Sequence, residues 1–282
     1  METGQKNGST NESKRDEAPG MNGRLRRAMG AGFIGKLFDR HREQLAAQLR
    51  KEMADIAKAE ADRIIAAIHM SDWNRVRNIM GAAHEQSVID SATFANQHMP
   101  KAQTFWHQRE TLRHALSLAP RGGMALEFGV ATGGTLSVIA EVRRGQGGVY
   151  GFDSFEGLPE TWRTGVPKGA FATSALPQVD GAELVKGWFD QTLPAFLATH
   201  PGPVDFLHVD CDIYSSTKTI FDLVGSRLRP GSIVLFDEFF NYPSWQEHEY
   251  KAWLEFVDRT GIKFVYECYT ANDEQVAVRI VA

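Results

Sequence analysis

The sequence is poor in cysteine and carries little excess charge. Its 282 residues include only two cysteines, Cys211 and Cys268, so a framework of several disulfides is excluded and a reducing cytoplasm is the expected location. The formal net charge of −4 creates no strong field for nucleic acid or for an anionic membrane surface. We therefore expect neither nucleic acid nor membrane as a partner.

Long apolar segments are also missing. No run of apolar residues approaches the length needed to cross a bilayer. The first twenty residues lack the apolar core of a signal peptide and are almost entirely polar, so we expect a disordered tail over residues 1–22. What is present is an ordinary globular composition, 43% hydrophobic, long enough for one full α/β domain and an extension.

Residues 23–100 are predicted to form a helical extension that serves as a lid or in oligomerisation. Apolar residues there recur at spacings of three and four, at Leu45, Leu49, Met53, Ile56, Ile64 and Ile68. This pattern predicts an amphipathic helix packed on its own domain or on a second subunit, and a homo-oligomer is expected. The polar face is mixed in sign, which disfavours a membrane-surface helix.

The remaining part, residues 101–282, reads as one α/β domain. A helix is predicted over Lys101–Leu118, and from Met124 onward predicted strands alternate with helices. The last two strands are joined by Ala271-Asn272-Asp273, a connection suited to a hairpin. The order predicts a doubly wound, Rossmann-like sheet with an antiparallel C-terminal hairpin at its edge.

A glycine-rich turn follows the first predicted strand. Glu127, Gly129 and Gly133 lie in the pattern E-x-G-x-x-x-G-G, which lets the backbone approach a ligand but does not match the dinucleotide fingerprint G-x-G-x-x-G. Asp153 ends the next strand, where an acid can accept hydrogen bonds from ribose hydroxyls. Its alternative role is a helix cap or a loop ion pair, and Glu127 could be a buried acid held by backbone amides. The combination favours an adenosine-containing ligand.

Two later strands end in carboxylates. Asp210 and Asp212 follow the apolar segment Val204–Val209, and Asp237 and Glu238 follow Ile233–Phe236. If these strands are adjacent and parallel, the acids meet at the carboxyl edge of the sheet, where open α/β folds bind ligands. Clustered carboxylates repel one another unless a cation lies among them, so the pattern predicts a hard divalent metal.

The remaining polar residues near these acids leave alternatives open. Asp212 is a candidate base or an orienting group, or it caps the helix that begins near Ser215. His208 is interpreted as a core histidine and His248 as the better candidate for a catalytic base. The aromatic residues of the segment 239–245 either line a pocket for a ring-containing acceptor or pack in the core.

Five motifs together resemble the class I S-adenosylmethionine-dependent methyltransferases, and more narrowly the macrocin O-methyltransferase group. They are LEFGVATGGT, VYGFDSFEGLPETW, VKGWFDQTLP, HVDCDIYSST and LFDEFFNYPSWQEHEYKAW, in that order within residues 103–282. The resemblance implies a seven-stranded sheet, bound S-adenosylmethionine, Mg²⁺ at the substrate, and transfer of a methyl group to a hydroxyl of a sugar or glycosylated natural product. The helical segment before Gln103 has no counterpart.

The resemblance also assigns roles to individual residues. It places Glu127, Gly129, Gly133 and Thr135 on the methionine-binding turn, Asp153 on the ribose, Trp188 and Phe189 beside adenine, and Asp210, Asp237 and Glu238 on the metal. The third metal position is commonly Asp or Asn in the family, so Glu238 is a departure. The alternatives are a nicotinamide-dependent oxidoreductase, a metal-independent small-molecule methyltransferase, or a non-catalytic protein that keeps the fold.

Overall fold

A computed structural model describes the chain from residue 23 to residue 282, with side chains from residue 32 onward. The tail predicted for residues 1–22 lies outside this part. The chain divides into two compact units, one ending at Asn74 and one comprising Arg75–Ala282. Helix α1 (Gly23–Arg77) is 55 residues long. No helix in the described part is both long enough and apolar enough to span a bilayer.

The second unit is built on one mixed sheet. Its eight strands lie in the order β1-β7-β8-β6-β5-β2-β3-β4. They are β1 (Gln103–Phe105), β2 (Met124–Phe128), β3 (Val149–Asp153), β4 (Glu183–Lys186), β5 (Val204–Val209), β6 (Leu228–Phe236), β7 (Phe264–Thr270) and β8 (Val276–Ile280). Only β8 runs antiparallel to its neighbours, β6 and β7. The predicted doubly wound sheet with a C-terminal hairpin is therefore confirmed.

The eighth strand, β1, corrects one prediction. Residues 101–105 were expected to open a helix, but Gln103 pairs in parallel with Cys268 at the free edge of β7. The unpaired backbone groups at that edge form hydrogen bonds with the N–H and C=O groups of this short segment, which therefore does not need to be helical. The helix, α3 (Gln108–Leu118), begins after His107, the N-cap residue. The sheet thus has one more strand than the seven that the family resemblance implied.

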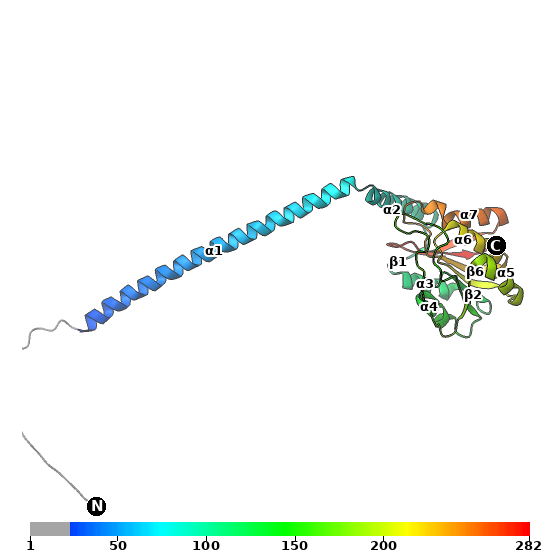
Figure 1. The fold of residues 1–282 in the computed structure, drawn as a ribbon, viewed down its shortest axis with the longest axis horizontal. Helices are drawn as coiled ribbons and strands as arrows, with labels where there is room; N and C mark the ends of the chain where they lie inside the picture. Colours follow the sequence, from blue (N-terminus) through cyan, green and yellow to red (C-terminus); the bar gives the residue numbers. More distant parts are fainter. Residues whose placement is uncertain (1–22) are drawn as a thin grey trace, which may run out of the picture. The chain divides into compact units, whose positions relative to one another are not determined.

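Helices cover both faces of the sheet (Figure 1). Helices α3 and α4 (Gly134–Arg143) lie on one face, and α5 (Phe189–Thr199), α6 (Tyr214–Val224) and α7 (Glu249–Thr260) lie on the other. Short 3₁₀ turns occur at Gly225–Arg227 and Trp245–Glu247. The side chains beneath the two helical layers form two apolar clusters, because strands buried on both faces must be apolar on both.

Helix α2 (Ile79–His98) packs on the sheet domain. The side chain of Asn78 caps it by accepting hydrogen bonds from two backbone amides of its first turn. Phe94 lies edge-on to the Trp245 ring, with centroids 5.4 Å apart, and the hydroxyl of Ser91 accepts a hydrogen bond from the backbone N–H of Asn241 at 2.8 Å. The second half of the predicted helical extension therefore supports the loop that follows β6.

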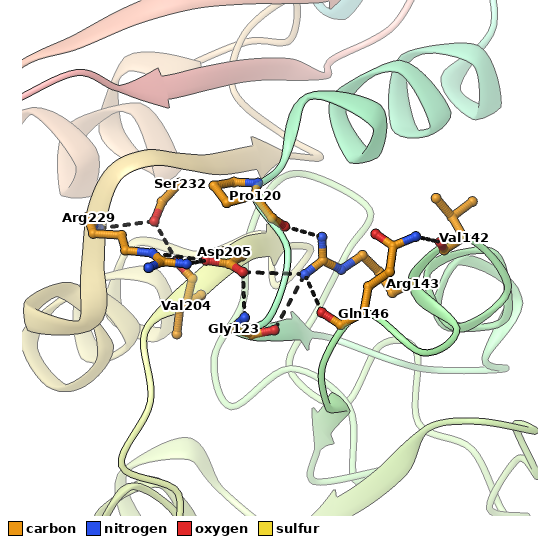
Figure 2. Close-up of polar contacts among 9 residues, drawn as sticks. All are labelled: Pro120, Gly123, Val142, Arg143, Gln146, Val204, Asp205, Arg229 and Ser232. Carbon is orange, nitrogen blue, oxygen red and sulfur yellow. Dashed lines mark hydrogen bonds and ion pairs between the residues drawn. The ribbon is translucent and has the colours of Figure 1, made fainter.

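A buried network of ion pairs and hydrogen bonds lies where the parallel strands of the sheet begin (Figure 2). The Asp205 carboxylate on β5 accepts hydrogen bonds from the Gly123 N–H at 2.6 Å and from Arg229 Nη2 at 2.6 Å. Arg143, which is 1% exposed, lies 3.6 Å from the same carboxylate and donates to the carbonyl of Pro120. Asp205 thus connects strand β5 to β6 through Arg229, to the turn before β2 through Gly123, and to the end of α4 through Arg143.

Replacing Asp205 with alanine should cost about 3–5 kcal/mol of folding free energy, because it leaves the Arg143 guanidinium buried without its counter-ion. Urea denaturation monitored by circular dichroism measures the loss. The matched control is Arg229→Ala, which removes a partly exposed cation while Arg143 still balances Asp205; its loss should be clearly smaller. Equal losses for the two variants would contradict this role for Asp205.

Candidate active site

The acids predicted to cluster lie together at the carboxyl edge of the sheet. Strands β5 and β6 are adjacent and parallel, with Val209 paired to Phe236, so Asp210 and Asp237 leave the sheet side by side. One carboxylate oxygen each of Asp210, Asp237 and Glu238 lies within 4.8 Å of the others. The predicted adjacency of the two strand ends is confirmed.

The acids of this cluster oppose one another's ionisation. Burial and the neighbouring Asp237 carboxylate hold the pKa values of Asp210 and Glu238 well above their usual range. Burial also opposes ionisation of Asp237, but His208 and a hydrogen bond from Gln275 lower its pKa. The Oε2 atom of Glu238 is buried and has no hydrogen-bond partner. These oxygen donors fit a hard divalent cation, which would remove the repulsion.

A row of three residues connects the first predicted site to the second. The fully buried His208 lies between two acids, with its Nδ1 atom 2.9 Å from Glu127 and its Nε2 atom 3.6 Å from Asp237. Burial opposes protonation, but the two carboxylates outweigh it and hold the pKa of His208 well above its usual value. The core position expected for His208 is confirmed, whereas its pairing with both acids was not predicted.

Asp212 does not cap the following helix. The N-cap residue of α6 is Ile213, and no side chain caps this helix end. Asp212 instead has a left-handed backbone conformation, with φ of 65°, which is uncommon for a non-glycine residue. Burial, with Asp237 nearby, raises the pKa of Asp212 to about 7. A carboxylate that titrates near neutrality is suited to accept a proton at physiological pH.

The glycine-rich turn is held against the acidic strand end. Gly129 has φ of 97°, and a Cβ atom there would lie 1.6 Å from the carbonyl oxygen of Asp210, so only glycine fits. The Asp153 carboxylate accepts hydrogen bonds from the N–H groups of Val130 and Ala131, at 2.9 and 2.8 Å, and from Phe155. Asp153 therefore shapes the turn, and its oxygens keep lone pairs for a further donor.

A cavity of about 500 Å³ joins these parts. Its lining includes Gly129, Asp153, Trp188, Phe189, Asp210, Asp212 and Glu238, all of them predicted site residues. Four other predicted site residues, Glu127, Gly133, Thr135 and Asp237, are not part of this lining. The same cavity is thus lined by residues assigned to the adenosine and by acidic residues.

His248 lies away from this cavity. It is half-buried, packs near the rings of Trp162 and Tyr242, and does not contribute to the cavity lining. Burial lowers its pKa, so the imidazole is predominantly neutral at pH 7. The structure thus favours Asp212 over His248 as the group that faces the cavity.

The aromatic segment that follows β6 packs in the core. Phe239, Phe240, Tyr242 and Trp245 are each at most 3% exposed. Of the two interpretations left open from the sequence, core packing is the one that the structure supports. The apolar lining of the cavity comes instead from other residues, among them Leu158, Pro159 and Phe171 of the loop after β3.

Two charged residues of the site were not identified from the sequence. Glu249, at the start of α7, is fully buried, and its Oε2 atom accepts a hydrogen bond from the Glu238 backbone N–H at 3.2 Å. Arg163 forms an ion pair with Glu274 at 3.0 Å and stacks on the Trp162 ring, 3.8 Å from its centroid. Neither residue follows the end of a predicted strand, and that position was what indicated the acids of the site in the sequence.

Comparisons with known proteins find methyltransferases. Residues 126–239 match the model of a family described as a methyltransferase domain. A curated relative, the 8-demethyl-8-(2,3-dimethoxy-alpha-L-rhamnosyl)-tetracenomycin-C 4'-O-methyltransferase of Streptomyces olivaceus, is 30% identical over 142 residues. The match covers 42% of this chain and 53% of the relative, so the chain spans about half the length of that protein.

The solved structures that are similar to part of this chain include two methyltransferases. The calicheamicin methyltransferase CalS11 is 24% identical, with a TM-score of 0.48, and the match covers 61% of this chain and 76% of that one. The O-methyltransferase NovP is 20% identical, with a TM-score of 0.49, and the match covers 62% of this chain and 80% of that one. The family model thus identifies a methyltransferase domain at residues 126–239, and part of the chain is similar to a known O-methyltransferase.

Proposed function

We propose that this protein transfers a methyl group from S-adenosylmethionine to a hydroxyl of a sugar or glycosylated natural product, with Mg²⁺ bound beside the acceptor. The observation that carries the proposal is the single cavity that joins Asp153, Trp188 and Phe189 to Asp210, Asp212 and Glu238. A donor at one end and an acceptor at the other would face each other across it. Such alignment supplies much of the rate enhancement in a bimolecular transfer.

The donor end would bind the adenosine part of S-adenosylmethionine. Asp153 has lone pairs left for the ribose hydroxyls, and its bonds to the turn after β2 fix it in place. Trp188 and Phe189 at the start of α5 provide apolar surface for the adenine ring. Gly129 keeps the backbone free of a side chain where the methionine part would pass.

The acidic end would hold the metal and the acceptor. The residues that would bind Mg²⁺ are Asp210, Asp237 and Glu238. The Glu249 carboxylate holds the backbone of Glu238 in place by accepting a hydrogen bond from its N–H group. When bound, a divalent cation lowers the pKa of a coordinated hydroxyl and stabilises the negative charge that develops on its oxygen. Asp212 faces the cavity with a pKa of about 7 and would accept the hydroxyl proton.

The substrate class follows from the relative and not from the cavity alone. The curated relative is described as a 4'-O-methyltransferase of a rhamnosylated tetracenomycin. A cavity of about 500 Å³ with apolar and acidic walls can hold the donor and a sugar ring. A glycoside with a free hydroxyl next to a second oxygen is the acceptor that this arrangement favours.

The direct test is an assay with methyl-labelled S-adenosylmethionine, Mg²⁺ and a panel of rhamnosides, other glycosides and catechols. We expect label in at least one glycoside and none in catechols that lack a sugar. Binding of S-adenosylhomocysteine and of NAD is compared by thermal shift on the same protein. NAD binding equal to that of S-adenosylhomocysteine would contradict the methyltransferase proposal, and label only in catechols would contradict the sugar acceptor.

Stabilisation by the metal should increase with pH. Because the pKa values of Asp210 and Glu238 are raised by folding, the folded protein holds protons that the unfolded chain has lost, and stability falls as pH rises toward these folded values. Mg²⁺ must displace those protons, so its binding strengthens over the same range. Thermal melts at pH 5.5 and 8 with and without MgCl₂ should show the larger shift at pH 8. A larger shift at pH 5.5 would contradict the metal site.

A further inference from the structure

A stripe of residues along α1 combines apolar and charged side chains at helical spacing. We call it the α1 stripe; its members are Phe38, Arg42, Leu45, Leu49, Met53, Ile56, Glu60 and Ile64. Steps of three and four residues place them on one side of the helix. Its six apolar members are 49–70% exposed in the isolated chain. An extended row of exposed large apolar side chains is typical of a surface that associates.

The stripe is nearly symmetric about its midpoint. Phe38 and Ile64 lie equally far from Lys51 in the sequence, and Leu49 and Met53 flank it. Arg42 and Glu60, the two charged members, are also equidistant from Lys51 and have opposite signs. A second copy of the helix running antiparallel, with its Lys51 at the same level, would bring apolar residues opposite apolar residues. It would also bring each Arg42 opposite the other copy's Glu60.

The charges flanking the stripe follow the same symmetry. Within one helix Asp39 pairs with Arg42 at 3.3 Å and Glu60 pairs with Arg63 at 3.4 Å, in the same acid-to-base order. In an antiparallel pair centred on Lys51, Asp39 of one copy is level with Arg63 of the other, and Arg42 is level with Glu60. Residues at the same level therefore carry opposite charges. Residues 36–50 contain four basic and two acidic residues, and residues 52–66 contain four acidic and two basic ones. A parallel pair in register would instead place like-charged halves together.

We propose that α1 is a homodimerisation element in which two copies of this chain pair antiparallel through the α1 stripe, centred on Lys51. The inference rests on the stripe and its charges and is independent of the proposed function. Lys51 itself is two residues from both Leu49 and Met53, which places it on the outer side of the pair. The two like charges at the centre therefore do not oppose association.

Charge exchange on the full-length protein tests this arrangement by sedimentation equilibrium. Arg42→Glu or Glu60→Arg alone should weaken the dimer by about tenfold or more, because each creates two like-charge contacts within the interface, one on either side of its centre. The double variant should return to within about threefold of the wild type. These positions lie about 27 Å apart along one helix, so rescue requires a second chain. The control is Lys58→Glu, an equal charge change on the outer side, which should leave the dimer unchanged.

Cysteine cross-linking determines the orientation. Ala46 and Ile56 are equidistant from Lys51, so a mixture of the Ala46→Cys and Ile56→Cys chains should form a heterodimeric disulfide under mild oxidation, whereas neither chain alone should link efficiently. The native cysteines are buried and should not contribute. Efficient self-linking of the Ala46→Cys chain would indicate a parallel pair and overturn the proposal. So would a wild-type protein that stays monomeric, whether free or bound to vesicles of anionic lipid.

Discussion

Substituting Asp210 or Asp237 by asparagine should abolish methyl transfer while S-adenosylhomocysteine still binds. Both acids belong to the cluster whose oxygens lie within 4.8 Å of one another, and asparagine removes the charge with little change in shape. Loss of a bound Mg²⁺ would remove several kcal/mol of stabilisation of the developing charge, so turnover should fall by about 10³-fold or more. The site proposed for the donor uses other residues of the cavity, so donor affinity should change by less than about threefold.

The experiment separates a metal role from a general loss of folding. Turnover is measured with the labelled-methyl assay and donor affinity by calorimetry on the same preparations. Asp180→Asn is the matched control, because this side chain is 92% exposed and pairs with Arg144 at the surface. EDTA should silence the wild type, and Mg²⁺ or Mn²⁺ should restore it. Activity that survives thorough chelation would show that the acids are structural or serve as a simple base.

Asp153→Ala should weaken binding of S-adenosylhomocysteine by ~1.5–3 kcal/mol, or roughly 10- to 150-fold. The variant loses the charged acceptor proposed for the ribose hydroxyls and also the bonds that hold the N–H groups of Val130 and Ala131. These two causes can be distinguished. Isothermal calorimetry is repeated with an analogue of the donor that lacks both ribose hydroxyls.

If Asp153 contacts the ribose directly, the wild type should bind S-adenosylhomocysteine more tightly than the analogue that lacks both ribose hydroxyls. Asp153→Ala should then bind these two ligands with similar affinity. If Asp153 only shapes the turn, both ligands weaken equally and the discrimination persists. Asp190→Ala is a useful control, since this acid also lines the cavity but lies in the first turn of α5 and not beside the turn after β2. Unchanged affinity of Asp153→Ala for S-adenosylhomocysteine would refute the placement of the ribose.

Much of the sheet domain could be predicted because its strands carry a local signal. Val204–Val209 and Leu228–Phe236 contain apolar runs that end in acids, and parallel strands buried on both faces require such runs. The hairpin of β7 and β8 was predictable from the turn residues between them. Strand β1 was not, because three residues have little propensity of their own and pair only where β7 offers a free edge.

The sequence by itself determined which residues could do chemistry. Acids at the ends of predicted strands, and glycines where the backbone turns, identified Asp153, Asp210, Asp237 and Gly129 without any coordinates. These signals are local, since they depend on residue type and on position relative to a strand end. The same holds for the α1 stripe, whose spacing and charge symmetry can be read from one helix.

The tertiary structure decided how those residues act on one another. Only the packing of β2, β5 and β6 brings Glu127, His208 and Asp237 into one row, and only the start of α7 places Glu249 under Glu238. The conformation of Asp212, which faces the cavity instead of capping α6, is likewise a result of packing. Burial and the distances between charges set the pKa values, and both depend on residues remote in the sequence. Electrostatics of the site is therefore a property of the fold, whereas its list of candidate residues is a property of the sequence.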